Sequence, residues 1–280
     1  MRKIDASQIT DLVEKLCIEA NCVLTDDIRG CFAACAQKET SALGREILGT
    51  LTENANIARE EMSPICQDTG MAVVFVTMGQ DVQIEGAYIE DAINAGVRSG
   101  YEKGYLRKSV VRDPLDRVNT NDNTPAVVHY EIVPGELFEI TVAPKGFGSE
   151  NMSQVKMLKP SQGVQGVKDF VLKTVKEAGA NPCPPIIVGV GIGGTMEKSA
   201  ILSKRALLRP VGTASDNPTH AALEAELLEA VNALGIGPAG LGGSTTAMDV
   251  HILTYPTHIA GLPVSVNIGC HATRHAQGSL

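Results

Sequence analysis

The stretch Ser63-Pro64-Ile65-Cys66-Gln67-Asp68-Thr69-Gly70 comes directly before the apolar run Met71–Val76. It places a thiol, an amide and a carboxylate side by side, between a proline and a glycine. The apolar run predicts a buried β-strand. Loops that are punctuated by Gly and Pro beside a strand can hold reactive side chains rigidly. We therefore expect the rest of the chain to be organised around this loop.

Two other cysteines have similar surroundings. Cys183 lies in Asn181-Pro182-Cys183-Pro184-Pro185, and Cys270 lies in Asn267-Ile268-Gly269-Cys270-His271. Iron–sulfur clusters bind cysteine thiolates, normally four for a cubane, so three ligands would leave one iron open. An open iron is a Lewis acid that polarises a bound hydroxyl. The hypothesis is that Cys66, Cys183 and Cys270 share one cluster, although their spacing alone has no signature.

Three of the other four cysteines are predicted to have a structural role. Cys17, Cys31 and Cys35 fall on apolar helical stripes, where a cysteine is typically a small core residue. Cys31 and Cys35, four residues apart, leave a shared metal as an open alternative. Cys22 has no clear setting. The sequence has no Cys-x-x-Cys motif, which argues against a zinc ribbon or a thioredoxin-type site.

The composition excludes several classes of protein. The net charge is −8, and no basic run with interleaved aromatic residues suggests nucleic-acid binding. No apolar run is long enough to span a bilayer, and the start Met1-Arg2-Lys3-Ile4-Asp5 lacks the apolar core of a signal peptide. We therefore expect a cytoplasmic protein that acts on neither membranes nor nucleic acids. An anionic substrate would need a local cluster of Arg and Lys.

The periodicity predicts an α/β fold, with mixed β-sheets covered by helices and a helical N-terminal segment over about residues 1–60. Strands are expected at 72–77, 186–190, 246–254 and 262–268. A β-hairpin is expected over 126–133 and 137–142, because Pro134-Gly135-Glu136 lies between the two runs. We expect one domain over residues 1–280, since no linker or repeat is apparent.

One glycine motif suggests a different function. Gly189-Val190-Gly191-Ile192-Gly193-Gly194 fits the G-x-G-x-x-G fingerprint of dinucleotide-binding proteins. The acidic residue expected downstream has no good candidate, because Asp216 lies in a loop. A tight joint between strand and helix, with Thr195 as the helix cap, explains these glycines without a cofactor.

Several polar residues in Gly- and Pro-rich loops have side chains suited to acid–base chemistry. Asp68 and His258 are candidates for proton transfer, and Arg107 and Lys145 for binding a carboxylate. The loop Lys145–Asn151 contains Gly146 and Gly148, whose backbone N–H groups can bind a carboxylate. The polar, aperiodic segment 105–125 is long for a structureless loop, which is typical of functional segments.

These stretches together resemble class I fumarate hydratases, in the N-terminal domain or the separate α subunit, a family that includes L(+)-tartrate dehydratase. The resemblance covers most of the chain. It rests on Cys66–Gly70, Leu106–Ser109, Asn119–Ala126, Lys145–Asn151, Cys183–Pro185 with Gly193–Thr195, and His258–Pro263 through Cys270.

The resemblance implies a set of roles for these residues. Cys66, Cys183 and Cys270 would ligate an oxygen-labile 4Fe–4S cluster. Gln67, Asp68, Arg107, Lys145 and a glycine of Gly146–Gly148 would line the substrate site, with Phe147 standing where a small residue is expected. His258 and Asp68 would transfer a proton to the departing hydroxyl.

The resemblance also implies a second polypeptide. A β subunit would supply the general base and further arginines, because only ten residues follow Cys270 and few cations, Arg274 among them, lie near the proposed iron. We therefore expect a homo- or hetero-oligomer acting on a small dicarboxylate, with fumarate and L-malate preferred over L(+)-tartrate. The alternative from another class is a non-enzymatic metal- or nucleotide-binding module. Anaerobic reconstitution separates the two, since only a cluster absorbs broadly in the visible range.

Overall fold

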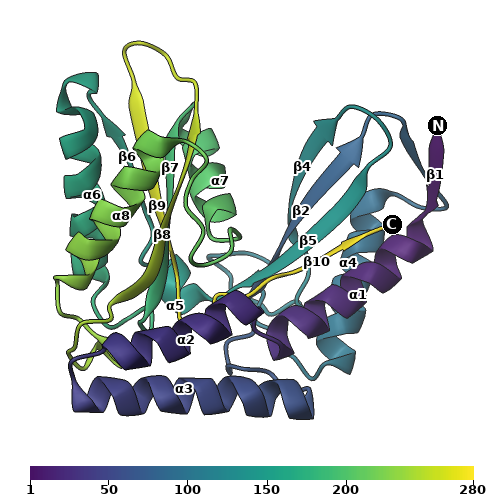
Figure 1. The fold of residues 1–280 in the computed structure, drawn as a ribbon. Coiled ribbons are helices and arrows are strands. Elements are labelled where there is room, and N and C mark those ends of the chain that lie inside the picture. Colours follow the sequence, from purple (N-terminus) through teal and green to yellow (C-terminus); the bar gives the residue numbers. More distant parts are fainter. The chain divides into compact units, whose positions relative to one another are not determined.

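The structure, a computed structural model, describes all 280 residues. Its internal contacts divide the chain into two compact units. Unit 1 comprises Met1–Thr25, Asn54–Phe147 and Arg274–Leu280, and unit 2 comprises Asp26–Glu53 and Gly148–Thr273. Each unit combines helices with a mixed sheet (Figure 1), which confirms the predicted α/β class. A division by contacts does not define functional domains, so a single domain over residues 1–280 stays a prediction.

The N-terminal segment is helical, as predicted, after one short strand. Strand β1 (Arg2–Asp5) leads into α1 (Ala6–Cys22), followed by α2 (Asp26–Lys38) and α3 (Ala42–Glu61). Asp5 starts α1 with a capping box, because its carboxylate accepts from the Ser7 N–H while Gln8 accepts from the Asp5 N–H. The spacing of Leu43, Ile47, Leu51 and Ala58 predicts one buried face of α3. Ala58 is buried as expected, together with Leu48 and Ala55, but Leu43 is exposed.

Unit 1 is built on a four-stranded sheet in the order β10-β5-β2-β4. Strands β1 and β3 form a separate two-stranded parallel sheet. The remaining elements of unit 1 are β2 (Met71–Gly79), β3 (Val82–Glu85), α4 (Ile89–Lys103), β4 (Val127–Val133), β5 (Phe138–Lys145) and β10 (Ala276–Ser279). Helix α5 (Phe147–Glu150) begins at Phe147, the last residue of the Asn54–Phe147 segment, and its other residues belong to unit 2.

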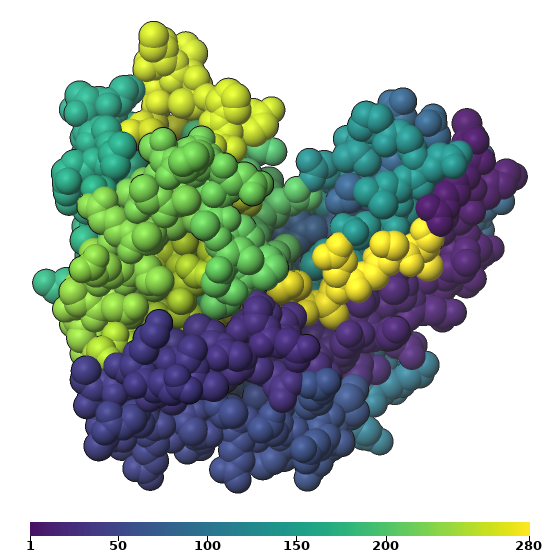
Figure 2. All heavy atoms as spheres, in the orientation of Figure 1, coloured from purple at the N-terminus to yellow at the C-terminus, as the bar shows by residue number.

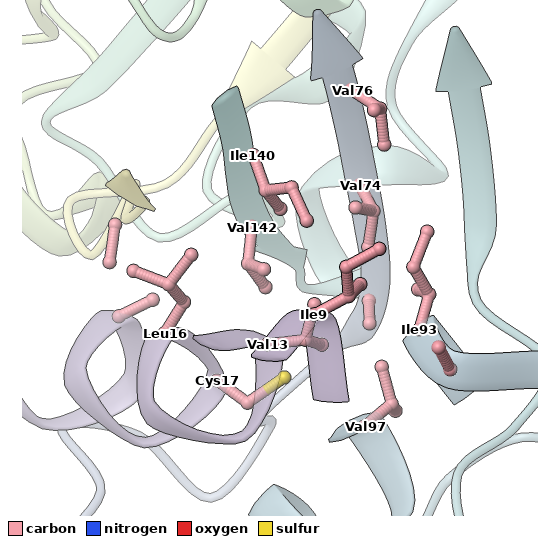
Figure 3. Close-up of a cluster of buried hydrophobic side chains, with 14 of the residues drawn as sticks. Ile9, Val13, Leu16, Cys17, Val74, Val76, Ile93, Val97, Ile140 and Val142 are labelled. Atoms are coloured by element: carbon pink, nitrogen blue, oxygen red, sulfur yellow. The ribbon is translucent and has the colours of Figure 1, made fainter. Parts of the chain in front are cut away.

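The core of unit 1 forms where α1 and α4 cover the sheet. Figure 3 shows Ile9, Val13 and Leu16 of α1 directed at side chains of the strands. Their spacing places them on one helical face, as the sequence predicted. The core is fully buried at Val74 of β2, Ile140 of β5 and Ile93 of α4, among others. This packing fixes the start of β2, and with it the loop that precedes β2.

The predicted β-hairpin is wrong in its pairing, although both strands exist. Strand β2 lies between β4 and β5, parallel to β4 and antiparallel to β5. The turn at residues 134–136 passes over the end of β2, where the Gln80 N–H donates to Val133 O (2.8 Å) and the Asp81 N–H donates to Gly135 O (3.0 Å). The predicted turn is therefore present, but the strand between β4 and β5 is β2, which comes from an earlier part of the chain.

Unit 2 is built on a second four-stranded sheet, in the order β6-β9-β7-β8. Helix α7 packs on one face of β7, and α6 and α8 contribute to the core on the other face. The elements are β6 (Gln154–Leu158), α6 (Gly163–Ala178), β7 (Ile186–Gly193), α7 (Met196–Ala206), α8 (Pro218–Asn232), β8 (Ala247–Tyr255) and β9 (Leu262–Gly269), with short 3-10 helices at Pro160–Gln162 and Pro238–Gly240.

The glycine motif of β7 has a packing role. A Cβ at Gly189 would lie 2.1 Å from Ser203 O, and one at Gly191 would lie 2.0 Å from Ser199 O, both in α7. These glycines therefore let the helix backbone lie directly on the strand. Thr195 precedes α7, but its hydroxyl donates to Glu197 rather than capping the helix backbone. The motif thus makes the tight strand–helix joint that the sequence analysis preferred over a nucleotide site.

Within unit 2, a buried carboxylate joins the α2–α3 corner to a distant loop. Glu39 is 2% exposed, and its carboxylate accepts from the backbone N–H groups of Ser41, Ser244 and Thr245, each at 2.8 Å. Burial opposes ionisation here, but these hydrogen bonds to the charged form prevail and lower the Glu39 pKa to about 2.

We expect Glu39→Gln to destabilise the chain by about 2–3 kcal/mol at pH 7, because an amide cannot accept all of these hydrogen bonds. Since the folded pKa lies below the ordinary value of 4.5, this stabilisation is present above pH 4.5 and is lost as the pH falls towards 2. Urea unfolding at pH 7 and at pH 3 measures it. A difference between wild type and variant that is the same at both pH values would contradict the assignment.

Candidate active site

The carboxylate of Asp68 is held in place by two backbone N–H groups in unit 1. One oxygen accepts from the Gly70 N–H at 3.0 Å, and the other accepts from the Phe147 N–H at 2.9 Å. Gly146 is adjacent, since a Cβ there would lie 3.2 Å from that second oxygen. The structure therefore brings together the Cys66 loop and the glycine loop, which lie almost 80 residues apart in the sequence.

The backbone of the Cys66 loop is fixed by hydrogen bonds to three other segments of unit 1. The Ile65 N–H donates to Asn21 O (3.0 Å), the Asn54 amide donates to Ile65 O (2.9 Å), and the Tyr101 hydroxyl donates to Thr69 O (2.8 Å). Gly70, with φ of +74°, turns the chain into β2 in a conformation that favours glycine. Burial raises the pKa of Tyr101, so its hydroxyl remains a donor at neutral pH.

The first part of the Cys66 loop is accessible to solvent, and its end is buried. Thr69 and Gly70 are buried, whereas Cys66 and Asp68 are half-buried and Gln67 is exposed. The Cys66 thiol donates to the Gln67 side-chain oxygen at 3.2 Å. A rigid backbone with accessible polar side chains is the arrangement that a binding loop requires.

The backbones of Arg107 and Lys145 lie next to this loop in unit 1. The Arg107 carbonyl accepts from the Thr69 hydroxyl at 3.1 Å, and the Arg107 side chain is exposed. Lys145 pairs with Met71 across β5 and β2, and its ammonium donates to Gly146 O at 3.3 Å. The two predicted carboxylate-binding cations thus belong to the same neighbourhood as Asp68.

Asn123 connects two of these segments, although no sequence pattern predicts an individual role for it. It is fully buried, accepts from the Ser109 N–H at 2.7 Å and donates to Gly70 O at 3.2 Å. The aperiodic segment around it is therefore fixed to the Cys66 loop. The run Asn119–Asn123 carried a signal, because polar residues without period in a long loop suggested function, but no pattern showed which asparagine is buried.

Cys183 and Cys270 lie together at one end of the unit 2 sheet. Cys183 precedes β7 and Cys270 follows β9, and these strands are antiparallel with Ile187 opposite Gly269. The His271 N–H donates to Cys183 O at 3.2 Å. Cys183 is exposed and has a φ of +54°, a backbone conformation that is unusual for a residue with a side chain and that gathers at functional sites.

Gly148 and His258, two further predicted site residues, also belong to unit 2. Gly148 lies in α5, where the second segment of unit 2 begins, and it is exposed. His258 is exposed in the connection between β8 and β9 (the upper yellow loop in Figure 1), where the Thr257 hydroxyl donates to Gly194 O at 2.9 Å. That is the opposite end of the sheet from Cys183 and Cys270. The eight residues of β9 lie between, so the separation is roughly 25 Å.

The remaining cysteines do not resemble these three. Burial raises the pKa of Cys17 to about 12, so its thiol stays protonated at neutral pH and is a poor ligand. Cys22 is buried as well. Cys31 and Cys35 are half-buried, not core residues as predicted, with sulfurs 3.6 Å apart. The face of α2 that carries Cys31 and Cys35 is therefore more accessible to solvent than its apolar spacing predicts.

The three loop thiols fit an iron–sulfur cluster by their chemistry. All three are free of disulfides and at least partly accessible, and soft thiolates are the ligands that such clusters take. Cys66 belongs to unit 1, and the other two belong to unit 2. Within each unit taken alone, no three His, Cys, Asp or Glu side chains gather to hold a metal ion.

Comparison with known proteins gives a family. A sequence model described as fumarate hydratase (Fumerase) matches residues 10–279. The chain therefore belongs to the fumarate hydratase family of hydro-lyases. None of the helices combines the length and the hydrophobicity that a membrane span requires.

Named relatives are similar over nearly their whole length. The putative L(+)-tartrate dehydratase subunit alpha of Methanocaldococcus jannaschii is 43% identical over 96% of each chain. The L(+)-tartrate dehydratase subunit alpha of Escherichia coli strain UTI89 is 36% identical over 98% of this chain and 90% of the relative. The K12 counterpart is 35% identical. These relatives are dehydratases, and their names describe one subunit of a larger enzyme.

Proposed function

We propose that this chain is the α subunit of a hydro-lyase that adds or removes water at a four-carbon dicarboxylate. The observation that carries the proposal is the Asp68 carboxylate, held by two backbone N–H groups in the loop that bears Cys66. A carboxylate fixed in this way is oriented for proton transfer without rearrangement. Family membership supports the reaction class.

Cys66, Cys183 and Cys270 would hold a 4Fe–4S cluster, which when bound supplies a Lewis-acidic iron that makes a hydroxyl a better leaving group. Arg107 and Lys145 would bind substrate carboxylates, Arg107 as a planar fork and Lys145 as a point charge. Gln67 and the backbone of Gly146 and Gly148 would complete the lining. Asp68 and His258 would deliver the proton to the departing hydroxyl, and a β subunit would supply the base and more arginines.

The relatives' names favour L(+)-tartrate as substrate, in contrast to the preference for fumarate and L-malate expected from the sequence. L(+)-tartrate and L-malate each carry two carboxylates and lose a hydroxyl group beside one of them, so the cations of this chain suit either substrate. The test is a comparison of kcat/KM for L(+)-tartrate, L-malate and fumarate, with anaerobically reconstituted α and β subunits together. Turnover of none of the three would overturn the proposed function. The predicted cytoplasmic location stays a prediction.

His258 would serve the site of a second copy of this chain. In its own unit it lies roughly 25 Å from Cys183 and Cys270, too far for proton transfer to a group they hold. The Ala260 N–H donates to its Nδ1 at 3.2 Å, which leaves the proton of the neutral ring on Nε2. The loop is exposed, and Ile259 beside it is 92% exposed, as expected of a segment that another molecule covers.

Complementation tests this assignment. Asp68→Asn and His258→Asn variants should each be nearly inactive. Dimers formed from an equal mixture should recover about a quarter of wild-type activity, since half are mixed and each mixed dimer has one intact site. The variants are co-refolded or co-expressed with the β subunit and assayed anaerobically. A mixture no more active than its components would contradict a shared site.

We expect Arg107→Met to raise KM for the dicarboxylate and to lower kcat as well, because a clamp that also orients the substrate affects both. Arg107→Lys should recover part of the loss in KM. Steady-state kinetics of the α and β subunits together measure both constants. Wild-type constants for Arg107→Met would mean that the segment near Arg107 is only structural.

A further inference from the structure

Arg274 lies under the Cys66 loop, not in a position to meet substrate. It is 4% exposed, and one guanidinium nitrogen donates to the backbone carbonyl of Asp68. It begins the C-terminal segment of unit 1, which Figure 2 shows in yellow running along the purple α1 helix. The expectation that Arg274 is one of the cations that bind substrate is not supported, because its side chain is buried.

The charge of Arg274 has no carboxylate partner. No ion pair includes it, and its Nε has no hydrogen-bond partner although it is buried. Burial raises the pKa values of Tyr101 and Cys22, and the nearby guanidinium opposes both shifts. A buried, unpaired cation destabilises a fold relative to an apolar residue of the same volume. Its presence here therefore indicates a task other than stability.

The hydrogen bonds of Asp68 indicate that task. Its carboxylate accepts from Gly70 and Phe147, its carbonyl accepts from Arg274, and the next carbonyl accepts from Tyr101. Arg274 is the one charged donor among these groups. Hydrogen bonds from a charged donor are stronger than neutral ones, so Arg274 limits rotation of the peptide that carries the Asp68 side chain.

We propose that Arg274 is a positioning residue, which holds the Asp68 backbone so that its carboxylate is aimed at the substrate. This inference rests on the proposed function. Arg274 does not touch substrate, so its loss acts through Asp68. It should therefore affect the rate of the chemical step more than binding.

The kinetic test compares Arg274→Met and Arg274→Lys, with Arg59→Met as the control at an exposed arginine of the same unit. Met keeps the volume and removes the unpaired charge, so the fold should survive. We expect Arg274→Met to lower kcat at least about 10-fold with KM within about 3-fold, and Lys to restore most of the loss. Unchanged kcat, or a Lys variant as impaired as Met, would overturn the proposal.

A double-mutant cycle tests whether Arg274 acts through Asp68. Arg274→Met should cause little further loss in an Asp68→Asn background, because residues that act as a unit are not additive. Equal losses in both backgrounds would overturn the proposal.

A readout without activity keeps the inference separate from the proposed function. Backbone amide exchange of residues 66–70 should be at least about 10-fold faster in Arg274→Met than in wild type or Arg59→Met, at equal Tm. If wild type turns over no dicarboxylate but exchange still rises, the proposed function fails and the anchoring stands. Unchanged exchange overturns the anchoring itself.

Discussion

Cys66→Ser, Cys183→Ser and Cys270→Ser should each abolish iron binding and hydro-lyase activity, while the fold remains. These three thiols lie in loops outside both cores, so a hydroxyl there remains solvated and causes little loss of stability. A serine oxygen is a poor substitute for thiolate toward iron–sulfur clusters. Iron and sulfide analysis after anaerobic reconstitution, together with a thermal melt, measures both effects.

The matched control is a cysteine of the core. Cys17 is fully buried, so Cys17→Ser should lower the unfolding free energy by about 1–3 kcal/mol with iron content unchanged. Cys31→Ser and Cys35→Ser should also keep their iron. Because both are half-buried, we expect them to destabilise the chain less than Cys17→Ser does. Iron lost from the control variants and retained by the loop variants would reverse the ligand assignment.

Asp68→Asn should lower kcat about 10²–10⁴-fold, the loss typical of a positioned acid or base. The amide keeps the size of the side chain but cannot carry the proton. It also sets an N–H₂ group against one of the two backbone donors that now hold the carboxylate. KM should change less, since Arg107 and Lys145 would still bind carboxylates. Steady-state and single-turnover rates measure the loss.

A Gln67→Asn variant is the control for general disturbance of the same loop. It shortens an exposed side chain without touching the hydrogen bonds of Asp68. Its effect should be mainly on KM. Equal losses of kcat in Asp68→Asn and Gln67→Asn would show that the loop, not the carboxylate, is what matters.

Much of unit 1 and unit 2 could be predicted because it depends on local pattern. The apolar face of α1 and the buried run of β2 carry their own periodicity, and both elements formed where expected. The pairing of β4 with β2 rather than with β5 could not be predicted, because nothing near the turn at residues 134–136 shows that an earlier strand lies between them.

The candidate site likewise contains residues that could be predicted from the sequence and residues that could not. Asp68 stood out because its type and its Gly- and Pro-bounded loop suit proton transfer. Arg274 and Asn123 did not, since their roles depend on contacts with residues 206 and 53 positions away. The distance of His258 from Cys270 follows from strand direction: a strand of eight residues separates two positions only twelve apart in sequence.

The most direct test of the account measures water elimination as a function of bound iron. The chain is reconstituted anaerobically to graded iron contents, mixed with the β subunit, and assayed with L(+)-tartrate and L-malate. Activity should rise with iron to a plateau at about four irons and four sulfides per chain, and it should fall together with the visible absorbance on exposure to air. Full activity without iron, or none at four irons per chain, would contradict it.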